Sequence, residues 1–147
     1  MIRSCSVCGR KNRIPVQHLH QEGRCGACKT LLPAQDVPIE VASAEELDAI
    51  AGGARVPVLI DFWAAWCAPC RAAAPEVKRA AHELRGQALV LKVDTEALPA
   101  LAARYHVRSI PQLTILVRGR VAASDAGVVP ARELVARVLR VAAEHAA

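Results

Sequence analysis

The stretch Val58-Leu59-Ile60-Asp61-Phe62-Trp63-Ala64-Ala65-Trp66-Cys67-Ala68-Pro69-Cys70 decides how the rest of the chain is interpreted. Its first half is an apolar run broken by one aspartate, which is typical of a buried β-strand. A C-x-x-C pair follows, and then a segment of helix-forming residues from Arg71 to Arg85. Strand, short turn and helix place Cys67 at a helix start, where unpaired N–H groups and the helix dipole stabilise a thiolate. We therefore expect redox chemistry at Cys67 and Cys70.

Outward from this stretch, strand and helix patterns alternate. Expected strands cover residues 37–41, 56–63, 88–94, 113–117 and 121–124. Expected helices run from the capping box at Ser43 to Gly52-Gly53, from Arg71 to Arg85 with a kink at Pro75, from a Thr95 cap to about Tyr105, and from Pro130 to about His145. This order predicts an α/β fold, a mixed sheet with helices on both faces, whose first strand lies at an edge because of Pro38.

The four remaining cysteines form two further C-x-x-C pairs, with the spacing C-x2-C-x16-C-x2-C. This spacing is a strong zinc signature, because two tight turns aim four thiolates at one ion. Gly9 and Gly26 are expected to relieve the turns sterically. A four-thiolate zinc ion has no open position, so we expect a structural site. The expected ligands are Cys5, Cys8, Cys25 and Cys28.

Two other interpretations of these cysteines remain open, a rubredoxin-like iron site and paired disulfides. No export signal is seen at the start of the chain, and a reducing cytosol disfavours structural disulfides. A third metal pair at Cys67 and Cys70 is the alternative to redox chemistry there, but no further cysteine pair remains to complete its tetrahedron. His18 and His20 lie between the metal pairs and are expected to be solvated loop residues.

Charge and composition narrow the function further. The chain has 147 residues, 53% hydrophobic and 22% charged, which is a globular composition without a membrane span. The formal net charge is +5, and the excess lies mostly in residues 1–36. A basic segment invites a nucleic-acid interpretation. Four zinc-bound thiolates reduce that charge, and residues 1–36 hold no aromatic side chain to stack on a base, so nucleic-acid binding is not favoured.

The W-C-x-P-C motif, together with Ser109-Ile110-Pro111 downstream, resembles the thioredoxin family over about residues 37–147. The four-cysteine segment resembles that of the zinc-containing, thioredoxin-2 type. The resemblance therefore implies a zinc-ribbon module at residues 1–32 and a thioredoxin domain at 37–147. It also implies that Cys67 is the exposed nucleophile and Cys70 the more buried resolving thiol.

The resemblance assigns further roles around this pair. Asp61 matches the buried acid beneath the cysteines, and Lys92 matches a lysine paired with that acid. A purely structural acid satisfied by Lys92 is the alternative, and plain packing is the alternative for the tryptophans. Pro111 matches a cis-proline that presents Ile110 to substrate. The implied substrate surface consists of Trp63, Trp66, Ala68, Pro69, Ile110, Pro111 and Gly127.

Three positions depart from the family pattern. Ala68 replaces the usual glycine between Cys67 and Pro69, and it is expected to stiffen the turn. Gln112 follows Pro111 where threonine is more usual, so peptide contacts are expected to differ. Arg71 stands where lysine is common, which keeps the charge.

The sequence thus predicts a cytoplasmic, monomeric protein-disulfide reductase with one structural zinc ion. The expected partners are disulfide-containing proteins and an NADPH-dependent thioredoxin reductase, because no nucleotide-binding glycine loop occurs in the chain. A zinc site that responds to oxidation is a sharper alternative to a purely structural cap. Two other functions remain open, a zinc-ribbon module that tethers a thioredoxin-like domain to nucleic acid or a protein complex, and an oxidant or isomerase of higher redox potential.

Overall fold

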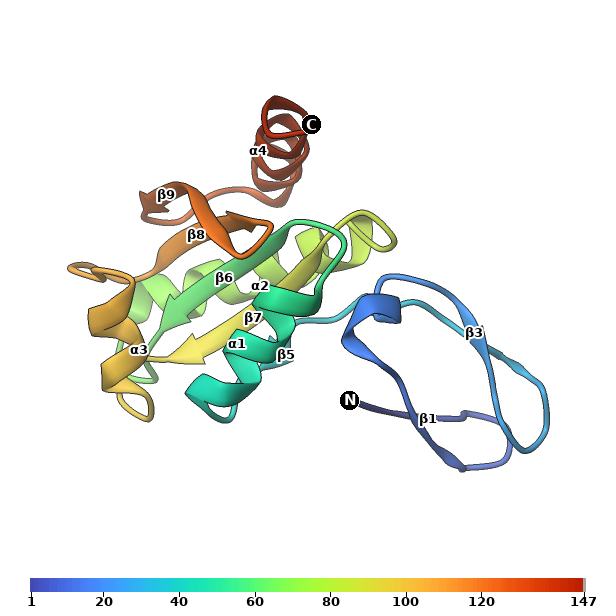
Figure 1. Cartoon of the computed structure of the whole chain (residues 1–147). Coiled ribbons are helices and arrows are strands. Elements are labelled where there is room, and N and C mark those ends of the chain that lie inside the picture. The colour runs from blue at the N-terminus through green and yellow to red at the C-terminus, as the bar shows by residue number, and fades with distance from the viewer. Residues whose placement is uncertain (147) are drawn as a thin grey trace.

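A computed structural model describes residues 1–146 and shows a small cysteine-bearing lobe beside a five-stranded sheet (Figure 1). The expected end of the second module, residue 147, lies outside the described residues. The lobe contains two antiparallel strand pairs joined by a short 3-10 helix. Its elements are β1 (Ile2–Ser4), β2 (Lys11–Arg13), η1 (Val16–His18), β3 (Gly23–Arg24) and β4 (Leu31–Leu32).

The main sheet has the strand order β5-β7-β6-β8-β9. The first three strands in this order are parallel, and the last two run antiparallel to their neighbours. The sheet is therefore mixed, and the strand that contains residues 39–40 lies at an edge as Pro38 indicated. Its strands are β5 (Ile39–Glu40), β6 (Val58–Trp63), β7 (Leu89–Asp94), β8 (Gln112–Val117) and β9 (Arg120–Ala126).

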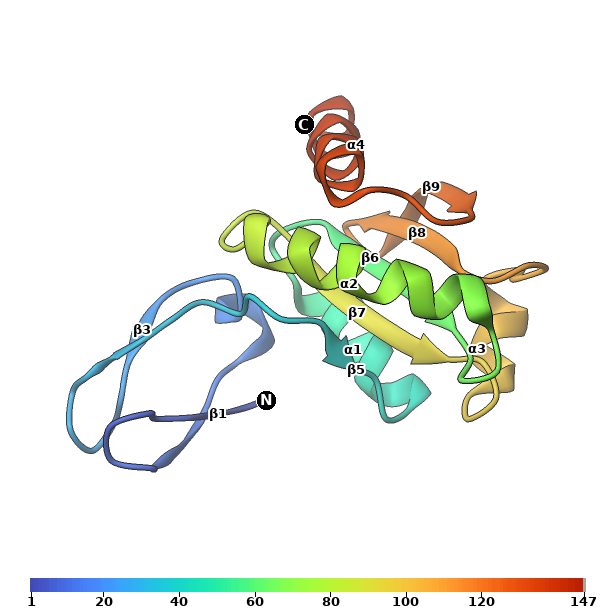
Figure 2. The same ribbon diagram turned by 180° about the vertical axis from the view of Figure 1, so that it is seen from behind.

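Helices cover both faces of this sheet, which confirms the expected fold class. Figure 1 shows α1 (Ala44–Gly53) and α3 (Pro99–Arg104) on the near face. Figure 2 shows α2 (Ala68–Glu83) across the opposite face, with α4 (Ala131–Glu144) beside it. Each face has its own apolar cluster, one containing Ile60 and Leu91 and the other containing Leu59 and Val90. None of the helices within residues 1–146 is long and apolar enough to cross a bilayer.

The redox helix begins at Ala68, directly after its N-cap Cys67, so Cys67 lies at the helix start as expected. Two other local expectations are wrong. Thr95 does not cap α3: its hydroxyl donates to the Trp63 carbonyl at 3.1 Å, and the helix begins at Pro99, which has its φ preset for a first turn. In the second cysteine turn, Lys29 rather than Gly26 takes the left-handed conformation, with φ 66°. Gly9, with φ 77°, fills the same place in the first turn, as expected.

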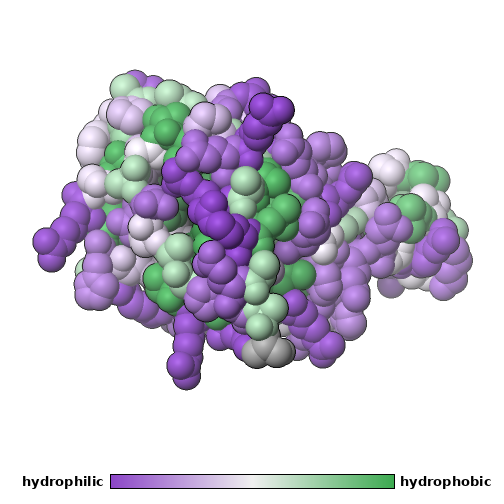
Figure 3. Space-filling model, turned by 90° about the horizontal axis from the view of Figure 1, so that it is seen from above, coloured by the Kyte–Doolittle hydropathy of each residue, from purple (hydrophilic) through white to green (hydrophobic). Residues whose placement is uncertain are grey.

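The cysteine lobe is tied to the main sheet by the chain between its two cysteine pairs. Leu19 is 1% exposed and belongs to the same apolar cluster as Leu47 of α1. Its carbonyl accepts the Arg3 guanidinium at 3.1 Å and the Gln35 N–H at 3.0 Å. In the view from above, the lobe stands to one side of a largely hydrophilic surface with scattered apolar residues (Figure 3). The lobe is thus a separate protrusion that Leu19 anchors in the neighbouring core.

Candidate redox site and metal centre

Cys67 and Cys70 are joined by a disulfide at the first turn of α2. The Cys67 Sγ accepts the backbone N–H of Cys70 at 3.1 Å, as an N-cap side chain does. The first turn carries no acidic side chain. An N–H donor and an unopposed helix dipole favour negative charge on this sulfur, so the position suits a thiolate once the disulfide is reduced.

Cys67 is less accessible than the family resemblance implied. It is only 3% exposed in the disulfide form, whereas the neighbouring Trp66 is 67% exposed. Cys70 is 4% exposed, so the expectation that it is the more buried of the two cysteines is wrong. The sulfur is reached from a groove of about 450 Å³, which is lined by Trp66, Cys67, Pro69, Arg108 and Ile110 among others. The Cys67 sulfur is therefore accessible through this groove rather than from an open surface.

The opposite wall of the groove is the loop that precedes β8. The peptide bond between Ile110 and Pro111 is cis, in agreement with the family pattern, and the Ile110 carbonyl oxygen lies 3.7 Å from the Cys67 Sγ. The Gly127 N–H donates to the Pro111 carbonyl at 2.9 Å. Residues far apart in sequence are thus brought to one place, directly facing the redox pair.

Asp61 is buried in the middle of β6. It lies on the face of the sheet that α2 covers, and its Oδ1 has no hydrogen-bond partner within the described residues. Burial raises the pKa of Asp61 to about 6, although the charge of Lys92 opposes this rise, and the charge of Glu40 adds to it. A carboxyl group with this pKa exchanges a proton readily near neutral pH.

Lys92 does not form the expected ion pair with Asp61. The two residues are register partners on β7 and β6, but the Lys92 Nζ lies over the Trp63 ring, 4.8 Å from its centroid. Such a cation–π contact competes with the carboxylate for the ammonium. Lys92 thus lies close enough to lower the pKa of Asp61, and the alternative of a carboxylate simply satisfied by this lysine does not hold.

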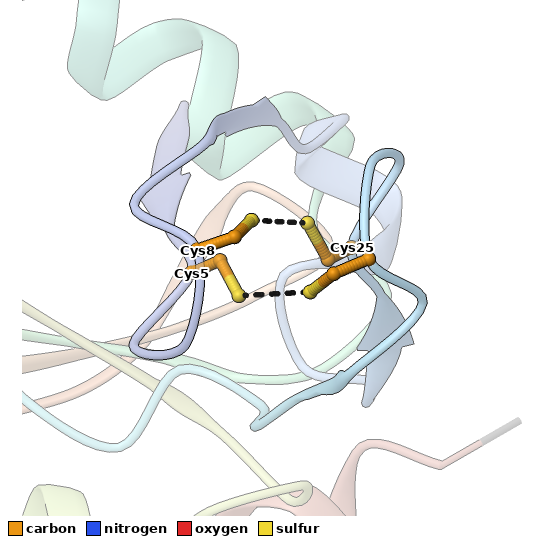
Figure 4. Close-up of side chains that lie close together, drawn as sticks. Cys5, Cys8 and Cys25 are labelled. Carbon is orange, nitrogen blue, oxygen red and sulfur yellow. Dashed lines mark hydrogen bonds between the residues drawn. The ribbon is translucent and has the colours of Figure 1, made fainter.

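The four remaining cysteines converge on one point between the two turns of the lobe. Their sulfur atoms all lie within 4.8 Å of one another, and the Cys5–Cys28 and Cys8–Cys25 sulfur pairs are 3.6 Å apart (Figure 4). Four sulfurs bound to one zinc ion at about 2.3 Å are separated by about 3.8 Å. The residues therefore fit a single tetrahedral metal ion, in agreement with the sequence spacing.

Several donors already point at these sulfurs. The Val7 N–H donates to Cys5 and the Ala27 N–H donates to Cys25, both at 3.4 Å. Backbone N–H groups, together with Asn12, hold the pKa of the Cys25 thiol at about 6. His18 is exposed at the end of η1 and bonded to Gln21, so this histidine is solvated as expected, although it lies in a 3-10 helix rather than a loop. His20 is half-buried, and its Nδ1 is buried without a hydrogen-bond partner within the described part of the chain, so the expectation that this residue is solvated is wrong.

The comparisons with known proteins agree with this geometry. A sequence model of the family Thioredoxin matches residues 37–140. Thioredoxin C-3 of Corynebacterium nephridii is 38% identical over 135 residues, 91% of this chain and 90% of that protein. Thioredoxin 1 of Chlorobaculum tepidum is 40% identical over 97 residues, 66% and 96% of the two chains. A mutant thioredoxin structure from Halobacterium salinarum NRC-1 has a TM-score of 0.68 at 30% identity, over 74% of this chain and 93% of that one.

The chain belongs to the thioredoxin family. Its redox pair makes it a thiol–disulfide oxidoreductase of the protein-disulfide reductase class. The 135 residues aligned with Thioredoxin C-3 exceed the thioredoxin domain, which begins at about residue 37, so the similarity to that relative extends into the cysteine lobe.

The thioredoxin fold brings most of the sequence-predicted residues to one end of the sheet. Cys67, Ala68, Pro69 and Ile110 line the groove, and Trp63 lies behind it beside Cys70. Sequence reasoning missed three polar residues, namely Glu96, Glu40 and Asn12. Glu96 accepts the Trp66 indole N–H, Glu40 lies in register with Lys92, and Asn12 bridges the two cysteine turns. No local sequence signal marks Glu96 or Glu40. Asn12 carries a weak signal, because it is a polar residue between two basic residues close to a cysteine pair.

Proposed function

We propose that this thioredoxin reduces disulfides of substrate proteins through Cys67 and Cys70, with zinc held by the four cysteines of the lobe. The observation that carries the proposal is the disulfide at the N-terminus of α2, where the Cys67 sulfur accepts the Cys70 N–H. In the reduced protein, the same N–H and the helix dipole favour a thiolate at Cys67.

The reaction proceeds by two exchanges. The Cys67 thiolate attacks one sulfur of the substrate disulfide, so a mixed disulfide forms and the other substrate sulfur leaves as a thiolate that takes up a proton. Cys70 then loses its proton and attacks the Cys67 sulfur. The second substrate thiol is released, and two electrons have passed from the protein to the substrate. The protein is left as the Cys67–Cys70 disulfide.

Asp61 is the proposed acceptor of the Cys70 proton, through a water molecule. Three observations support this role: its burial, its unpartnered Oδ1 and its pKa of about 6. Lys92 tunes the carboxyl group by its charge. A base whose pKa lies near the working pH can both accept a proton and release it again.

Substrate peptides are proposed to lie along the groove between the two loops that meet at Cys67. The exposed Trp66 ring and Ala68 and Pro69 form one side, and Ile110 and Pro111 form the other, with Gly127 beside them. Trp63 supports this surface from behind. The main-chain groups next to Pro111 are available to an extended peptide, as in strand addition.

Zinc is the proposed metal because four thiolates in a tetrahedron are its typical structural ligands. When bound, the ion cross-links the two turns and supplies no open position for catalysis. We further propose that residues 1–32 form this zinc ribbon and residues 37–147 the catalytic domain. Four free thiols outside the redox pair suit a reducing compartment, so we propose that the protein is cytoplasmic. We also propose that it is a monomer and that it receives electrons from an NADPH-dependent thioredoxin reductase.

The decisive experiment combines turnover with trapping. The wild type is expected to catalyse insulin-disulfide reduction by dithiothreitol and to hold about one zinc ion per chain. Cys70→Ser is expected to accumulate a mixed disulfide with insulin, visible on non-reducing gels, whereas Cys67→Ser is expected to form none. Turnover by Cys70→Ser at the wild-type rate would refute the two-step exchange.

A further inference from the structure

Three charged side chains lie in one row across the sheet below the redox helix. Glu40 on β5 is the register partner of Lys92 on β7, and Lys92 is the register partner of Asp61 on β6. Register partners on neighbouring strands leave the sheet on the same face. The row faces α2, because its members alternate with Ile60 and Leu91, which pack on the opposite face.

Lys92 therefore has a carboxylate on either side. Its Nζ lies over the Trp63 ring and makes no ion pair within 4.0 Å of Asp61 or Glu40 in the described structure. One ammonium is thus shared between two acids and is fixed to neither. Asp61 is buried with an unpartnered oxygen, whereas Glu40 lies at the exposed edge strand.

The electrostatic effects in the row follow from this arrangement. Burial raises the pKa of Asp61, Lys92 lowers it and Glu40 raises it. Burial also raises the pKa of Glu40, Lys92 and the Trp63 indole lower it, and Asp94 on β7 raises it slightly. From α2, Arg71 and Cys70 face the same place, because they line a cavity of about 270 Å³ together with Lys92 and Trp63.

We propose that Glu40 competes with Asp61 for Lys92 and is thereby a positioning residue for proton transfer from Cys70. This inference rests on the proposed role of Asp61 as proton acceptor. While Glu40 is charged, it draws the Lys92 ammonium toward the sheet edge, and the Asp61 carboxylate remains a stronger base. Without the Glu40 charge, Lys92 stabilises only the Asp61 carboxylate, so the Asp61 carboxyl group releases its proton more readily.

The titration of Asp61 tests the competition directly. The Asp61 carboxyl resonance is followed by ¹³C NMR against pH in the reduced protein. Glu40→Gln is expected to move the midpoint to lower pH, and Glu40→Asp, which keeps the charge, is expected to restore it at least partly. Glu45→Gln is the matched control, because it removes an exposed carboxylate of α1 that does not face Lys92. A Glu40→Gln midpoint equal to that of the wild type, or shifted no more than that of Glu45→Gln, would overturn the proposal.

A double-mutant comparison tests whether Glu40 acts through Lys92. Glu40 also acts on Asp61 directly by its charge, across two strand spacings of about 4.8 Å, and this direct part does not need Lys92. In a Lys92→Gln background, Glu40→Gln is therefore expected to shift the Asp61 midpoint clearly less than in the wild type. An equal shift in both backgrounds contradicts competition for the lysine.

The rate profile provides the functional readout. Pre-reduced protein is mixed with insulin without another reductant, and the reduction rate is measured from about pH 5 to 9, a range that spans the Asp61 midpoint. The acidic limb of the rate profile is expected to lie at lower pH in Glu40→Gln than in the wild type. Below the wild-type Asp61 midpoint, the rate of Glu40→Gln, expressed as a fraction of its own plateau, is expected to be roughly twofold higher than that of the wild type. Failure of the wild type to reduce insulin refutes the proposed function, whereas an unmoved Asp61 midpoint in Glu40→Gln refutes the role of Glu40 alone.

Discussion

Trp66 donates its indole N–H to the Glu96 carboxylate at 2.8 Å. The bond joins the start of the redox helix to the loop between β7 and α3, and it holds in place a ring that is 67% exposed. The Asp94 Oδ1 in turn accepts the Glu96 N–H at 2.9 Å, which fixes that loop. The aromatic wall of the groove is therefore preorganised, although it has little packing of its own.

Loss of this bond is expected to weaken substrate binding more than the chemical step. Glu96→Ala frees the Trp66 ring, so ordering it against a substrate costs additional free energy. A hydrogen bond of this kind contributes about 1 kcal/mol, which corresponds to a roughly fivefold higher KM for a protein disulfide with kcat little changed. Glu83→Ala, on the exposed end of α2, is the matched control. Equal KM values for Glu96→Ala and the wild type would contradict a role for the bond.

The buried Asp61 carboxyl is expected to make stability depend on pH. Its folded pKa of about 6 lies above the ordinary 3.8, so the folded state binds the proton more tightly. The protein therefore loses stability as pH rises from about 4 through about 6, by roughly 3 kcal/mol. Asp61→Asn is expected to remove this loss, and to exceed the wild type in stability at neutral pH but not near pH 4. Urea unfolding of the oxidised proteins measures this, and a difference that is the same at both pH values would contradict it.

The elements around the redox pair were predictable because their signals are local. The apolar run that ends at Trp63 specifies a buried strand, and the C-x-x-C pair with Pro69 specifies the helix start. The four-cysteine spacing likewise fixed the metal cluster, since each turn aims its own two sulfurs. In each case residues that are close together in the sequence determine the local geometry, so the sequence alone predicts it.

The relationships that tune the site depend on tertiary register and were not predictable. Glu40 lies beside Lys92 only because β5 pairs with β7 at that register, which residues 37–41 do not encode by themselves. The Lys92 ammonium lies over Trp63 rather than at Asp61, a choice between two partners that spacing cannot decide. The burial of Cys67 results from the loop at Ile110, which is 43 residues away along the chain.

The cysteine lobe and the main sheet share a core residue, so damage to one is expected to destabilise the other. Leu19 is 1% exposed, and Leu19→Ala is expected to cost about 2–5 kcal/mol of unfolding free energy. Leu31→Ala is the control in the same lobe, because Leu31 is 43% exposed and its loss is expected to cost far less. Unfolding of the zinc-loaded full chain is followed by tryptophan fluorescence, since Trp63 and Trp66 both belong to the redox site. An unchanged transition in Leu19→Ala would show that the lobe is only loosely attached.

Asn12 is the buried polar side chain that joins the two cysteine turns. Its Nδ2 donates to the Arg10 carbonyl at 3.1 Å and to the Cys25 Sγ at 3.6 Å, and its Oδ1 accepts the Gly26 N–H at 2.9 Å. The amide thus contacts the second turn both as a donor to the Cys25 sulfur and as an acceptor for the Gly26 N–H, and its bond to the Arg10 carbonyl links it to the first turn. A carboxylate of the same shape keeps the acceptor but loses the donor, and it adds negative charge beside the sulfurs.

Asn12→Asp is therefore expected to weaken zinc binding by about 10- to 100-fold, the usual effect of losing a residue that orients metal ligands. Competition with a chromogenic chelator measures the affinity, and the rate of zinc release by peroxide is expected to rise in parallel, because less tightly held thiolates are oxidised sooner. Lys11→Ala, an exposed neighbour on the same strand, serves as the control for general damage to the lobe. If Asn12→Asp and Lys11→Ala bind zinc equally well, the amide has no part in holding the metal, and the cysteine turns position their sulfurs unaided.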